Sequence, residues 1–293
     1  MDPYQQALNS FKTLLTSQGK SPSTVASYSR DVKQFLDFLK AHYIPFSQVE
    51  ALTLNHYQKG LPENRINSIR RAIISIRLFF RHLHTKGTIS SNPFEEFQIP
   101  SRNEALPNLL TPQQFKDLRK LPDSETLKGS RDAALLDLLG FEGIKVSELI
   151  ELQWEDFLYE SGSLRIQHGR PRVLKLCREA TDALQDLHTR AHPQNGWIFR
   201  SIKGETLGKT KMSRHGIKFV LYELGQSIKL EHLNAEMLRH NAMNSLLDRG
   251  FSVEEIKNHL GLQQIGNIAK HIRKQHSQFF SMDESRTIPS ENS

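Results

Sequence analysis

Apolar residues recur at helical spacing through the first hundred residues, and this pattern constrains the fold more than any other feature of the chain. Between residues 24 and 39 they follow one another at steps of three and four: Val25, Tyr28, Val32, Phe35, Leu36 and Leu39. The segment 67–85 repeats the pattern with Ile69, Ile73, Ile76, Phe80 and Leu83. Residues at such spacing share one helix face, so both segments are predicted to be amphipathic helices of a helical domain over residues 1–98.

The ends of these helices are marked as well. Ser21-Pro22-Ser23 offers capping hydroxyls and a proline that a helix entrance tolerates. Asn92-Pro93 ends the helical block, because a residue before proline is disfavoured in helical geometry. Periodicity then disappears over residues 99–110, where Pro100 and Pro107 predict an extended linker.

The remainder of the chain is predicted to be a second domain of mixed type over residues 111–284, followed by a flexible tail at 285–293. Thr111-Pro112-Gln113-Gln114 opens it as a capped helix start. We expect helices over 133–139 and 146–152 and near Arg214, Glu236 and Ser252, a hairpin over 162–176 with its turn at 168–171, and at most a short buried strand at 196–199. The fold class is therefore mainly α with a small β element (α+β).

Charge and composition narrow the functional classes. The chain has 39 Lys and Arg against 32 Asp and Glu, a net charge of +7, and residues 1–100 carry 12 against 7, or +5 of it. Such a balance suits a polyanionic partner. The single cysteine, Cys177, excludes an internal disulfide, and the 13 histidines show no ligand spacing. We therefore expect no metal, no cofactor and no membrane segment, and a cytoplasmic protein.

Four separated stretches, in matching order and spacing, resemble the tyrosine recombinase (phage integrase) family, of the Xer type. They are SPSTVASYSRDVKQFLDFL (21–39), SIRRAIISIRLFFRHLHTKGTISSNPFEEFQIP (68–100), SRDAALLDLLGFEGIKVSELIELQWEDF (130–157) and MLRHNAMNSLLDRGFSVEEIKNHLGL (237–262). The resemblance implies an N-terminal SAM-like core-binding domain and a C-terminal catalytic-type domain that together form a C-shaped DNA clamp.

The resemblance also implies a set of catalytic positions. In the family, two arginines and two histidines surround the scissile phosphate, a hairpin lysine protonates the leaving oxygen, and a tyrosine attacks phosphorus. By their flanking residues these positions fall on Lys145, His168, Glu236, Arg239, Leu262 and His271. Arg239 alone keeps the family's residue; Glu236 and Leu262 occupy the two histidine positions, and His271 occupies the tyrosine position.

The nucleophile is the decisive position. Residues 223–293 contain no tyrosine, whereas the family's nucleophile lies in that region. Without a covalent nucleophile, strand exchange loses the intermediate that divides it into two reversible steps. We therefore expect a catalytically degenerate member. The alternative is an active recombinase in which His271 attacks phosphorus and His168 acts as the acid; against it, His271 reads as an exposed histidine in a basic run.

Affinity for duplex DNA depends mainly on basic residues spread over a face, so it survives the loss of an active site. The residues expected to contact DNA are Lys20, Ser21, Thr24, Arg65, Ser68, Arg70, Arg71, Arg77, Arg170, Arg172 and Arg239. Two simpler interpretations remain: a solvated cationic face on the first domain, and, for Arg239, a structural arginine that binds helix-end carbonyls.

The expected function is site-specific binding of double-stranded DNA on the nucleoid, linked to recombination or integration but without strand transfer. The expected protein partner is an active tyrosine recombinase, or a second copy of the chain, through the apolar patch at Phe279-Phe280. A third interpretation is a regulator that binds another recombinase and no DNA.

Overall fold

The structure is a computed structural model that describes residues 2–61, 66–99, 109–193, 195–204 and 206–264. The chain divides into two units, Met1–Leu106 and Pro107–Ser293. The expected linker falls almost wholly outside the described residues. So do Arg65, His271 and the Phe279-Phe280 patch, and the expected tail.

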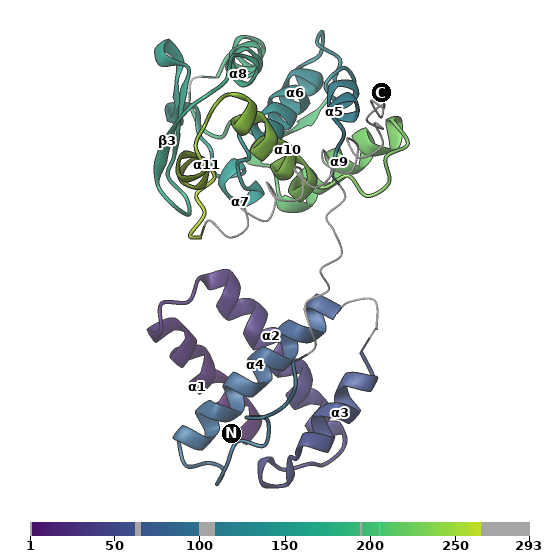
Figure 1. The fold of residues 1–293 in the computed structure, drawn as a ribbon, viewed down its shortest axis with the longest axis vertical. Helices are drawn as coiled ribbons and strands as arrows, with labels where there is room; N and C mark the ends of the chain where they lie inside the picture. Colours follow the sequence, from purple (N-terminus) through teal and green to yellow (C-terminus); the bar gives the residue numbers. More distant parts are fainter. Residues whose placement is uncertain (1, 62–65, 100–108, 194, 205, 265–293) are drawn as a thin grey trace, which may run out of the picture. The chain divides into compact units, whose positions relative to one another are not determined.

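The first unit is helical. Its elements are α1 (Pro3–Ser17), α2 (Pro22–Ala41), a short 3-10 turn η1 (Phe46–Gln48), α3 (Ala51–Lys59) and α4 (Ile66–Thr85). Helix α2 begins where the sequence predicts, since the Ser21 hydroxyl accepts a hydrogen bond from the backbone N–H of Thr24 at 3.2 Å. Figure 1 shows α2 and α4 crossing at the centre of this unit.

Aromatic side chains fill the core of the first unit. Phe35, Phe80 and Phe94 are fully buried, and Phe80 and Phe94 meet edge to face with ring centroids 4.8 Å apart. Edge-to-face contacts add stability beyond the burial of the rings themselves. The apolar stripes of α2 and α4 therefore face one common core, as their periodicity predicts.

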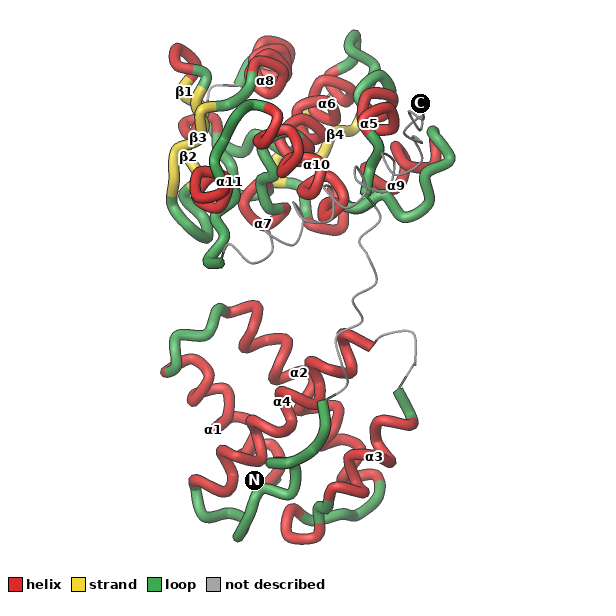
Figure 2. Tube along the Cα trace, viewed as in Figure 1, coloured by secondary structure: helices red, strands yellow, loops and turns green. Residues whose placement is uncertain are grey.

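The second unit is also dominated by helices, which Figure 2 colours red against a few short yellow strands. The helices are α5 (Pro112–Leu118), α6 (Leu127–Gly140), α7 (Val146–Leu149), α8 (Arg178–Ala191), α9 (Arg214–Ser227), α10 (Ala235–Asp248) and α11 (Val253–His259), with 3-10 turns η3 (Trp154–Asp156) and η4 (Tyr159–Ser161). The strands are β1 (Phe157–Leu158), β2 (Ser163–Ile166), β3 (Arg172–Lys175), β4 (Arg200–Lys203) and β5 (Thr206–Lys211). The predicted mainly helical fold class with small sheets is confirmed.

Two small antiparallel sheets accompany these helices. One has the strand order β1-β2-β3 and contains the predicted hairpin, in which Leu164 pairs with Leu174. The other is the β4–β5 hairpin, which the sequence analysis does not predict. The hairpin turn at 168–171 includes Gly169, whose φ of 81° suits a residue without a Cβ.

Residues 196–199, for which we expect at most a short buried strand, form none. Trp197 makes only an isolated bridge with Gln153, and β4 begins after the segment, at Arg200. Ile198 and Phe199 are apolar because they insert into the core, where they are 2% and 1% exposed. The expected helix over 146–152 is likewise shorter, since α7 ends at Leu149.

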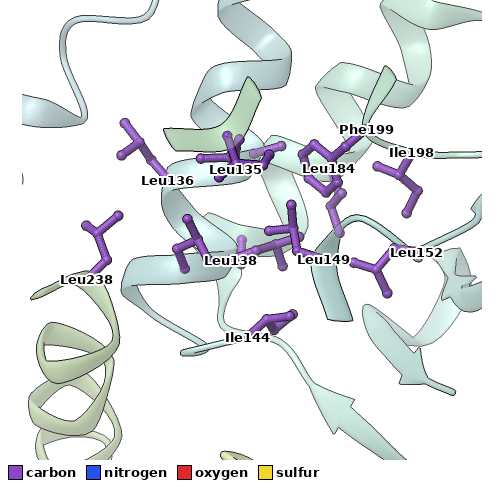
Figure 3. Packing of buried hydrophobic residues seen from close by; sticks show 14 of the residues in the cluster. Leu135, Leu136, Leu138, Ile144, Leu149, Leu152, Leu184, Ile198, Phe199 and Leu238 are labelled. Atoms are coloured by element: carbon purple, nitrogen blue, oxygen red, sulfur yellow. The ribbon is translucent and has the colours of Figure 1, made fainter. Parts of the chain in front are cut away.

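Leucine dominates the core of the second unit. Helix α6 lies inside this unit, and Figure 3 shows Leu135 and Leu138 among side chains from α7, α8 and the 198–199 segment. A smaller apolar cluster joins α10 to α11 through Met243, Leu246, Ile256 and Leu260. This second cluster fixes the end of α11 against the rest of the unit, where the polar network described next is built. No helix in the described ranges has the length and apolar character to cross a bilayer.

Candidate functional site

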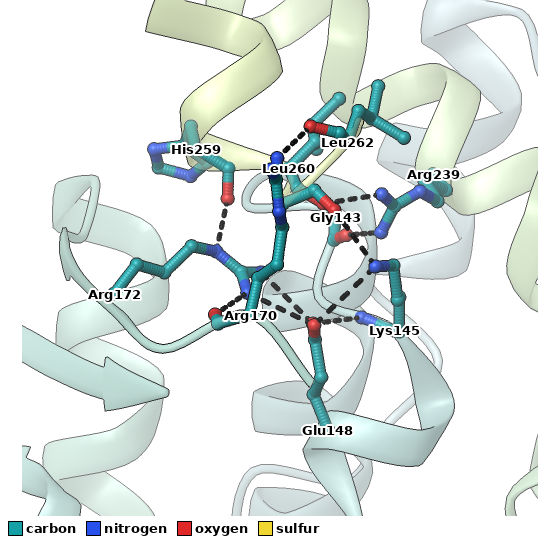
Figure 4. A network of polar contacts seen from close by, with 10 residues as sticks. Gly143, Lys145, Glu148, Arg170, Arg172, Arg239, His259, Leu260 and Leu262 are labelled. Carbon is teal, nitrogen blue, oxygen red and sulfur yellow. Dashed lines mark hydrogen bonds and ion pairs between the residues drawn. The ribbon is translucent and has the colours of Figure 1, made fainter. Parts of the chain in front are cut away.

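The end of α11 is surrounded by basic side chains. Four consecutive backbone carbonyls, at residues 259–262, each accept a hydrogen bond from a different cationic side chain (Figure 4). The pairs are Arg172 Nε to His259 O at 2.7 Å, Arg239 Nη2 to Leu260 O at 2.6 Å, Lys145 Nζ to Gly261 O at 3.1 Å, and Arg170 Nη1 to Leu262 O. We call this arrangement the α11 cation cluster.

Helix physics explains the arrangement. The last carbonyls of a helix have no partner within the helix, and the helix dipole places partial negative charge at that end. His259 is the last residue of α11 and Leu260 its C-cap, and the carbonyls of Gly261 and Leu262 follow directly after the helix. The four cations come from separate elements: Lys145 from the N-cap of α7, Arg170 and Arg172 from the β2–β3 turn and β3, and Arg239 from α10. The cluster therefore ties four parts of the second unit to one helix end.

Glu148 on α7 completes the cluster. Arg172 binds it with two parallel hydrogen bonds, Nη1 to Oε1 and Nη2 to Oε2, both 3.0 Å long. The backbone N–H of Lys145 donates to Oε2 at 3.1 Å, and the Lys145 ammonium lies 3.7 Å from Oε1. Burial alone would raise the pKa of Glu148, but the hydrogen bonds and charge of Arg172 outweigh it and hold the pKa below its usual value.

Arg239 is the retained family residue, and it is buried at 8% exposure. Besides Leu260, its guanidinium donates to the carbonyl of Gly143. Gly143 has a φ of 62°, and a Cβ there would collide with Leu260 and Ala242. Burial lowers the pKa of Arg239, against the opposing pull of Glu148 and Glu236. In this structure Arg239 therefore donates to one helix-end carbonyl, that of Leu260 at the C-cap of α11, and to the carbonyl of Gly143 in the loop after α6.

The other expected catalytic positions within the described residues are Lys145, which belongs to the cluster, and His168, Leu262 and Glu236. Burial lowers the pKa of Lys145, although Glu148 opposes the shift. His168 is exposed at the hairpin turn, with Nε2 4.0 Å from a carboxylate oxygen of Glu151. Leu262 is half-buried against the small apolar cluster of α10 and α11.

Glu236, at the start of α10, has a largely exposed side chain, and its Oε1 lies 3.8 Å from Nε2 of His240. The structure thus brings Lys145, Arg170, Arg172 and Arg239 together, with Leu262 contributing only its carbonyl. Within the described residues, His168 and Glu236 are not partners in the hydrogen bonds given above for the cluster.

A second ionic cluster lies beside the first. Glu142 is fully buried, and its carboxylate lies 2.8 Å from Nε2 of His259 and 3.2 Å from Nη1 of Arg249. The backbone N–H of Cys177 donates to it at 2.7 Å. Burial would raise the pKa of Glu142, but His259 and these other partners hold it below its usual value. The pKa of the Cys177 thiol is raised to about 12 by burial first and by Glu142 second, so the thiol stays protonated.

In the first unit, the arginines of α4 have intramolecular partners. Arg71 binds the buried carboxylate of Asp31 on α2 through Nε at 2.7 Å and Nη2 at 3.0 Å. Arg77 donates to the carbonyl of Glu95 at 3.3 Å, and Arg81 binds the Glu95 carboxylate at 2.6 Å.

The remaining residues expected to contact DNA sit near the start of α2 and on α4. Lys20 and Ser68 are exposed, whereas Thr24 and Arg70 are half-buried. Ser21 caps α2 and also contacts the Thr24 hydroxyl at 2.8 Å. Among the residues that the structure describes, no group of three or more side chains is arranged to hold a metal ion.

The sequence analysis missed the carboxylates that organise both units. Asp31 had a usable signal: it lies between Tyr28 and Phe35 at helical spacing, so it falls on the inner face of α2, and a buried carboxylate needs a cationic partner. Glu148 is part of the Val-Ser-Glu-Leu stretch, which in the sequence serves only to locate the expected catalytic position at Lys145. Glu142 and His259 are far apart in the sequence, and no local pattern joins them.

Family models cover both units. The model described as "Phage integrase family" matches residues 108–277, and the model described as "Phage integrase, N-terminal SAM-like domain" matches residues 8–87. Among curated proteins, the chain is 29% identical to "Tyrosine recombinase XerC" of Pelobacter propionicus over 280 residues, which is 92% of this chain and 91% of that protein. It is 24% identical to "Tyrosine recombinase XerD" of Listeria monocytogenes, over 89% of this chain and 92% of that protein.

Solved structures share the fold at lower identity. A lambda integrase dimer bound to a COC′ core site superposes with a TM-score of 0.71 at 14% identity, covering 91% of this chain and 94% of that one. The Tn1549 transposon integrase in complex with circular intermediate DNA superposes with a TM-score of 0.67 at 16% identity, covering 90% and 94%. Both of those proteins are bound to DNA in their structures.

Proposed function

The chain belongs to the phage integrase (tyrosine recombinase) family, and from this we propose that it binds duplex DNA at recombination or integration sites without cutting it. One observation supports the part of this proposal that the protein does not cut DNA. The basic side chains of the α11 cation cluster, including Lys145 and Arg239 at expected catalytic positions, already bind the chain's own carbonyls and Glu148. A phosphate at this place would reach only the N–H groups that these partners leave free.

The residue types at the other positions support the same proposal. Lys145 offers a point charge and not the two-pronged donor of an arginine. Glu236 carries a carboxylate where a developing negative charge would repel it, and Leu262 has no donor in its side chain. Loss of one preorganised donor costs about 100- to 1,000-fold in rate. The losses are not additive, yet together with His271 in place of a tyrosine they remove the family's chemistry.

Binding of DNA needs fewer specific groups. We propose that the first domain, over residues 1–98, contacts phosphates through the start of α2 and through α4. The second domain, over 111–284, then contacts the DNA as well, and the linker at 99–110 joins it to the first. When basic residues neutralise phosphates, the counterions condensed on the duplex are released, so the affinity of the protein for DNA falls steeply as the salt concentration rises. This function places the protein on the nucleoid, as a partner of an active recombinase or as a site-binding factor.

The first test asks whether a strand is cut. Purified full-length protein is incubated with a nicked suicide duplex, from which a covalent adduct cannot religate, and adducts are separated on a denaturing gel. We expect none. An adduct that disappears in the His271→Ala variant would instead establish an active recombinase with an atypical site.

The second test measures duplex affinity as a function of salt. The slope of log K against log salt falls by about 1 for each phosphate contact that a variant loses. We expect Arg70→Ala to lower the affinity for duplex DNA and Ser68→Arg to raise it. The control is Arg178→Ala, on the exposed face of α8, which should change neither the affinity nor the slope. If the protein retains no duplex in a salt-sensitive way, the proposal is contradicted. The remaining interpretation is then a regulator that binds another recombinase and no DNA.

A further inference from the structure

An aspartate at the contact between α2 and α4 has almost no access to solvent. The side chain of Asp31, on α2, is 5% exposed, whereas that of its partner Arg71, on α4, is 42% exposed. The two helices pack against each other in the first unit (Figure 1). Burying an unpaired carboxylate is costly, so Asp31 requires a cation at this place. The pair therefore has its carboxylate inside the unit and part of its guanidinium at the surface.

The carboxylate binds one edge of the guanidinium. Nε of Arg71 donates to one oxygen of Asp31 at 2.7 Å, and Nη2 donates to the other at 3.0 Å. A guanidinium has five N–H groups in one plane, and this side-on pair uses two of them. Within the described residues, Nη1 of Arg71 has no hydrogen-bond partner. The edge formed by Nη1 and the second N–H of Nη2 therefore remains for a further acceptor.

Two other arginines of α4 are held differently. Arg77 donates to the backbone carbonyl of Glu95 at 3.3 Å, and Arg81 pairs with the Glu95 side chain, which is 54% exposed. An exposed ion pair restrains its arginine weakly, because both side chains can rotate away into water. A carboxylate fixed inside the unit cannot rotate away, so Asp31 holds Arg71 in one orientation.

From this geometry we propose that Asp31 is a positioning residue for a DNA contact of Arg71. It holds the guanidinium so that the edge of Nη1 and Nη2 binds one phosphate with two hydrogen bonds. Arginine forms such paired bonds with phosphate, and they are stronger than bonds between neutral groups. A side chain that is already ordered loses less entropy on binding. This inference rests on the proposed DNA binding and deepens it, since it names the acidic group behind one expected contact.

The charge of Asp31 by itself predicts the opposite effect on DNA binding. Its carboxylate is negative and lies beside the proposed phosphate contact, so by Coulomb's law its removal should raise the affinity for a polyanion. If Asp31 positions Arg71, its removal should instead lower the affinity. Asp31→Asn keeps the size of the side chain and removes the charge, so the sign of the change in affinity separates the two effects.

The test measures binding of the full-length protein to a fluorescein-labelled duplex of mixed sequence at low salt, by fluorescence anisotropy. We expect Asp31→Asn to weaken binding about three- to tenfold, which corresponds to the cost of ordering one long side chain. The matched control is Asp37→Asn on the same helix, which breaks an exposed pair with Lys33. This control should leave binding unchanged or strengthen it, because it only removes a negative charge.

A second variant leaves the carboxylate in place. Arg71→Lys keeps a positive charge beside Asp31, but an ammonium has no second edge to offer a phosphate. This variant should weaken duplex binding at least about threefold. Its control is Arg81→Lys, at the exposed pair with Glu95, which should change binding less than about twofold. Circular dichroism confirms that each variant is folded at the assay temperature.

The coupling between the two residues distinguishes positioning from a purely structural role. In an Arg71→Ala background, Asp31→Asn should no longer weaken binding, because no guanidinium remains to be held. The inference is overturned if Asp31→Asn binds duplex as tightly as Asp37→Asn, if Arg71→Lys binds like the parent, or if Asp31→Asn weakens binding equally with and without Arg71. In these three cases the parent protein still binds duplex, and the proposed function stands. A parent protein that retains no duplex would overturn both.

Discussion

At the scale of single residues, Glu148 supplies the negative charge that balances the basic side chains of the α11 cation cluster. It is 2% exposed and balances Arg172, whose side chain is 10% exposed, while also facing Lys145. A buried charge that loses its partner is strongly destabilising, whereas the intact pair contributes little net stability. The role of Glu148 is therefore revealed by removing it and not by counting its bonds.

We predict that Glu148→Ala lowers the free energy of unfolding of the second unit by about 3–5 kcal/mol, because it leaves Arg172 uncompensated. Urea denaturation followed by tryptophan fluorescence measures this. The control is Asp182→Ala, which breaks an exposed pair with Arg178 and should cost less than about 1 kcal/mol. Equal losses in the two variants would show that Glu148 does not balance a buried charge.

Glu142 makes the stability of the second unit depend on pH in the acidic range. Its pKa is held below the usual 4.5 by His259, the Cys177 amide and Arg249, although burial acts in the opposite direction. A carboxyl with a lowered pKa stabilises the fold above its unfolded-state pKa, and this stability is lost as the pH falls through the lowered value. We predict that the free energy of unfolding declines between about pH 5 and pH 3, and less steeply in Glu142→Gln. Parallel curves for parent and variant would contradict the assignment.

At the scale of elements, α11 is a short helix on which the cation cluster depends. Its start is a capping box: the Ser252 hydroxyl accepts from the Glu255 N–H at 3.3 Å, and the Glu255 carboxylate accepts from the Ser252 N–H at 2.8 Å. Since short helices are marginal by themselves, this cap and the apolar contacts of Ile256 and Leu260 maintain it.

Ser252→Ala should cost about 1 kcal/mol, because the Glu255 N–H loses its acceptor and the Glu255 carboxylate loses the Ser252 hydroxyl as a donor. We expect faster hydrogen exchange of the amides from Ile256 to Leu262, measured by mass spectrometry, with little change in α8. Ser252→Thr keeps the hydroxyl and should exchange like the parent. Unchanged exchange in Ser252→Ala would mean that packing alone holds α11.

The helices were more predictable from sequence than the polar network. Helices α2 and α4 follow from their apolar periodicity, and the starts of α2 and α5 follow from Ser21 and Thr111, because these signals are local. The β4–β5 hairpin was not predicted, since Arg200 to Lys211 shows neither alternation nor a strong turn pair. The bonds between α11 and residues such as Lys145 depend on tertiary packing, which no local pattern in one sequence encodes.

At the scale of the whole molecule, the two units have separate cores. The apolar cluster of the first unit contains residues up to Ile99, and those of the second begin at Leu110. The first is rich in phenylalanine and the second in leucine. Both tryptophans, Trp154 and Trp197, belong to the second unit, so their fluorescence reports that unit alone.

We predict that Phe35→Ala destabilises the first unit by about 3–5 kcal/mol and leaves the tryptophan-monitored transition in place. Circular dichroism should then show an early helical transition that fluorescence does not detect. Phe199→Ala is the reciprocal variant, since it should shift the fluorescence transition instead. A fluorescence midpoint that moves with Phe35→Ala would demonstrate coupled unfolding of the two units.

Under the proposed function, a phosphate that approaches the α11 cation cluster competes with carbonyls of the same chain for its N–H groups. A group attached to the same chain competes at a high effective concentration, so it is displaced only at the cost of detaching the segment. Loosening α11 would then raise affinity for a polyanion without adding a single positive charge. Under the proposed function, sequence changes that strengthen or weaken this helix would adjust the affinity of the second unit for DNA while leaving every cation in place.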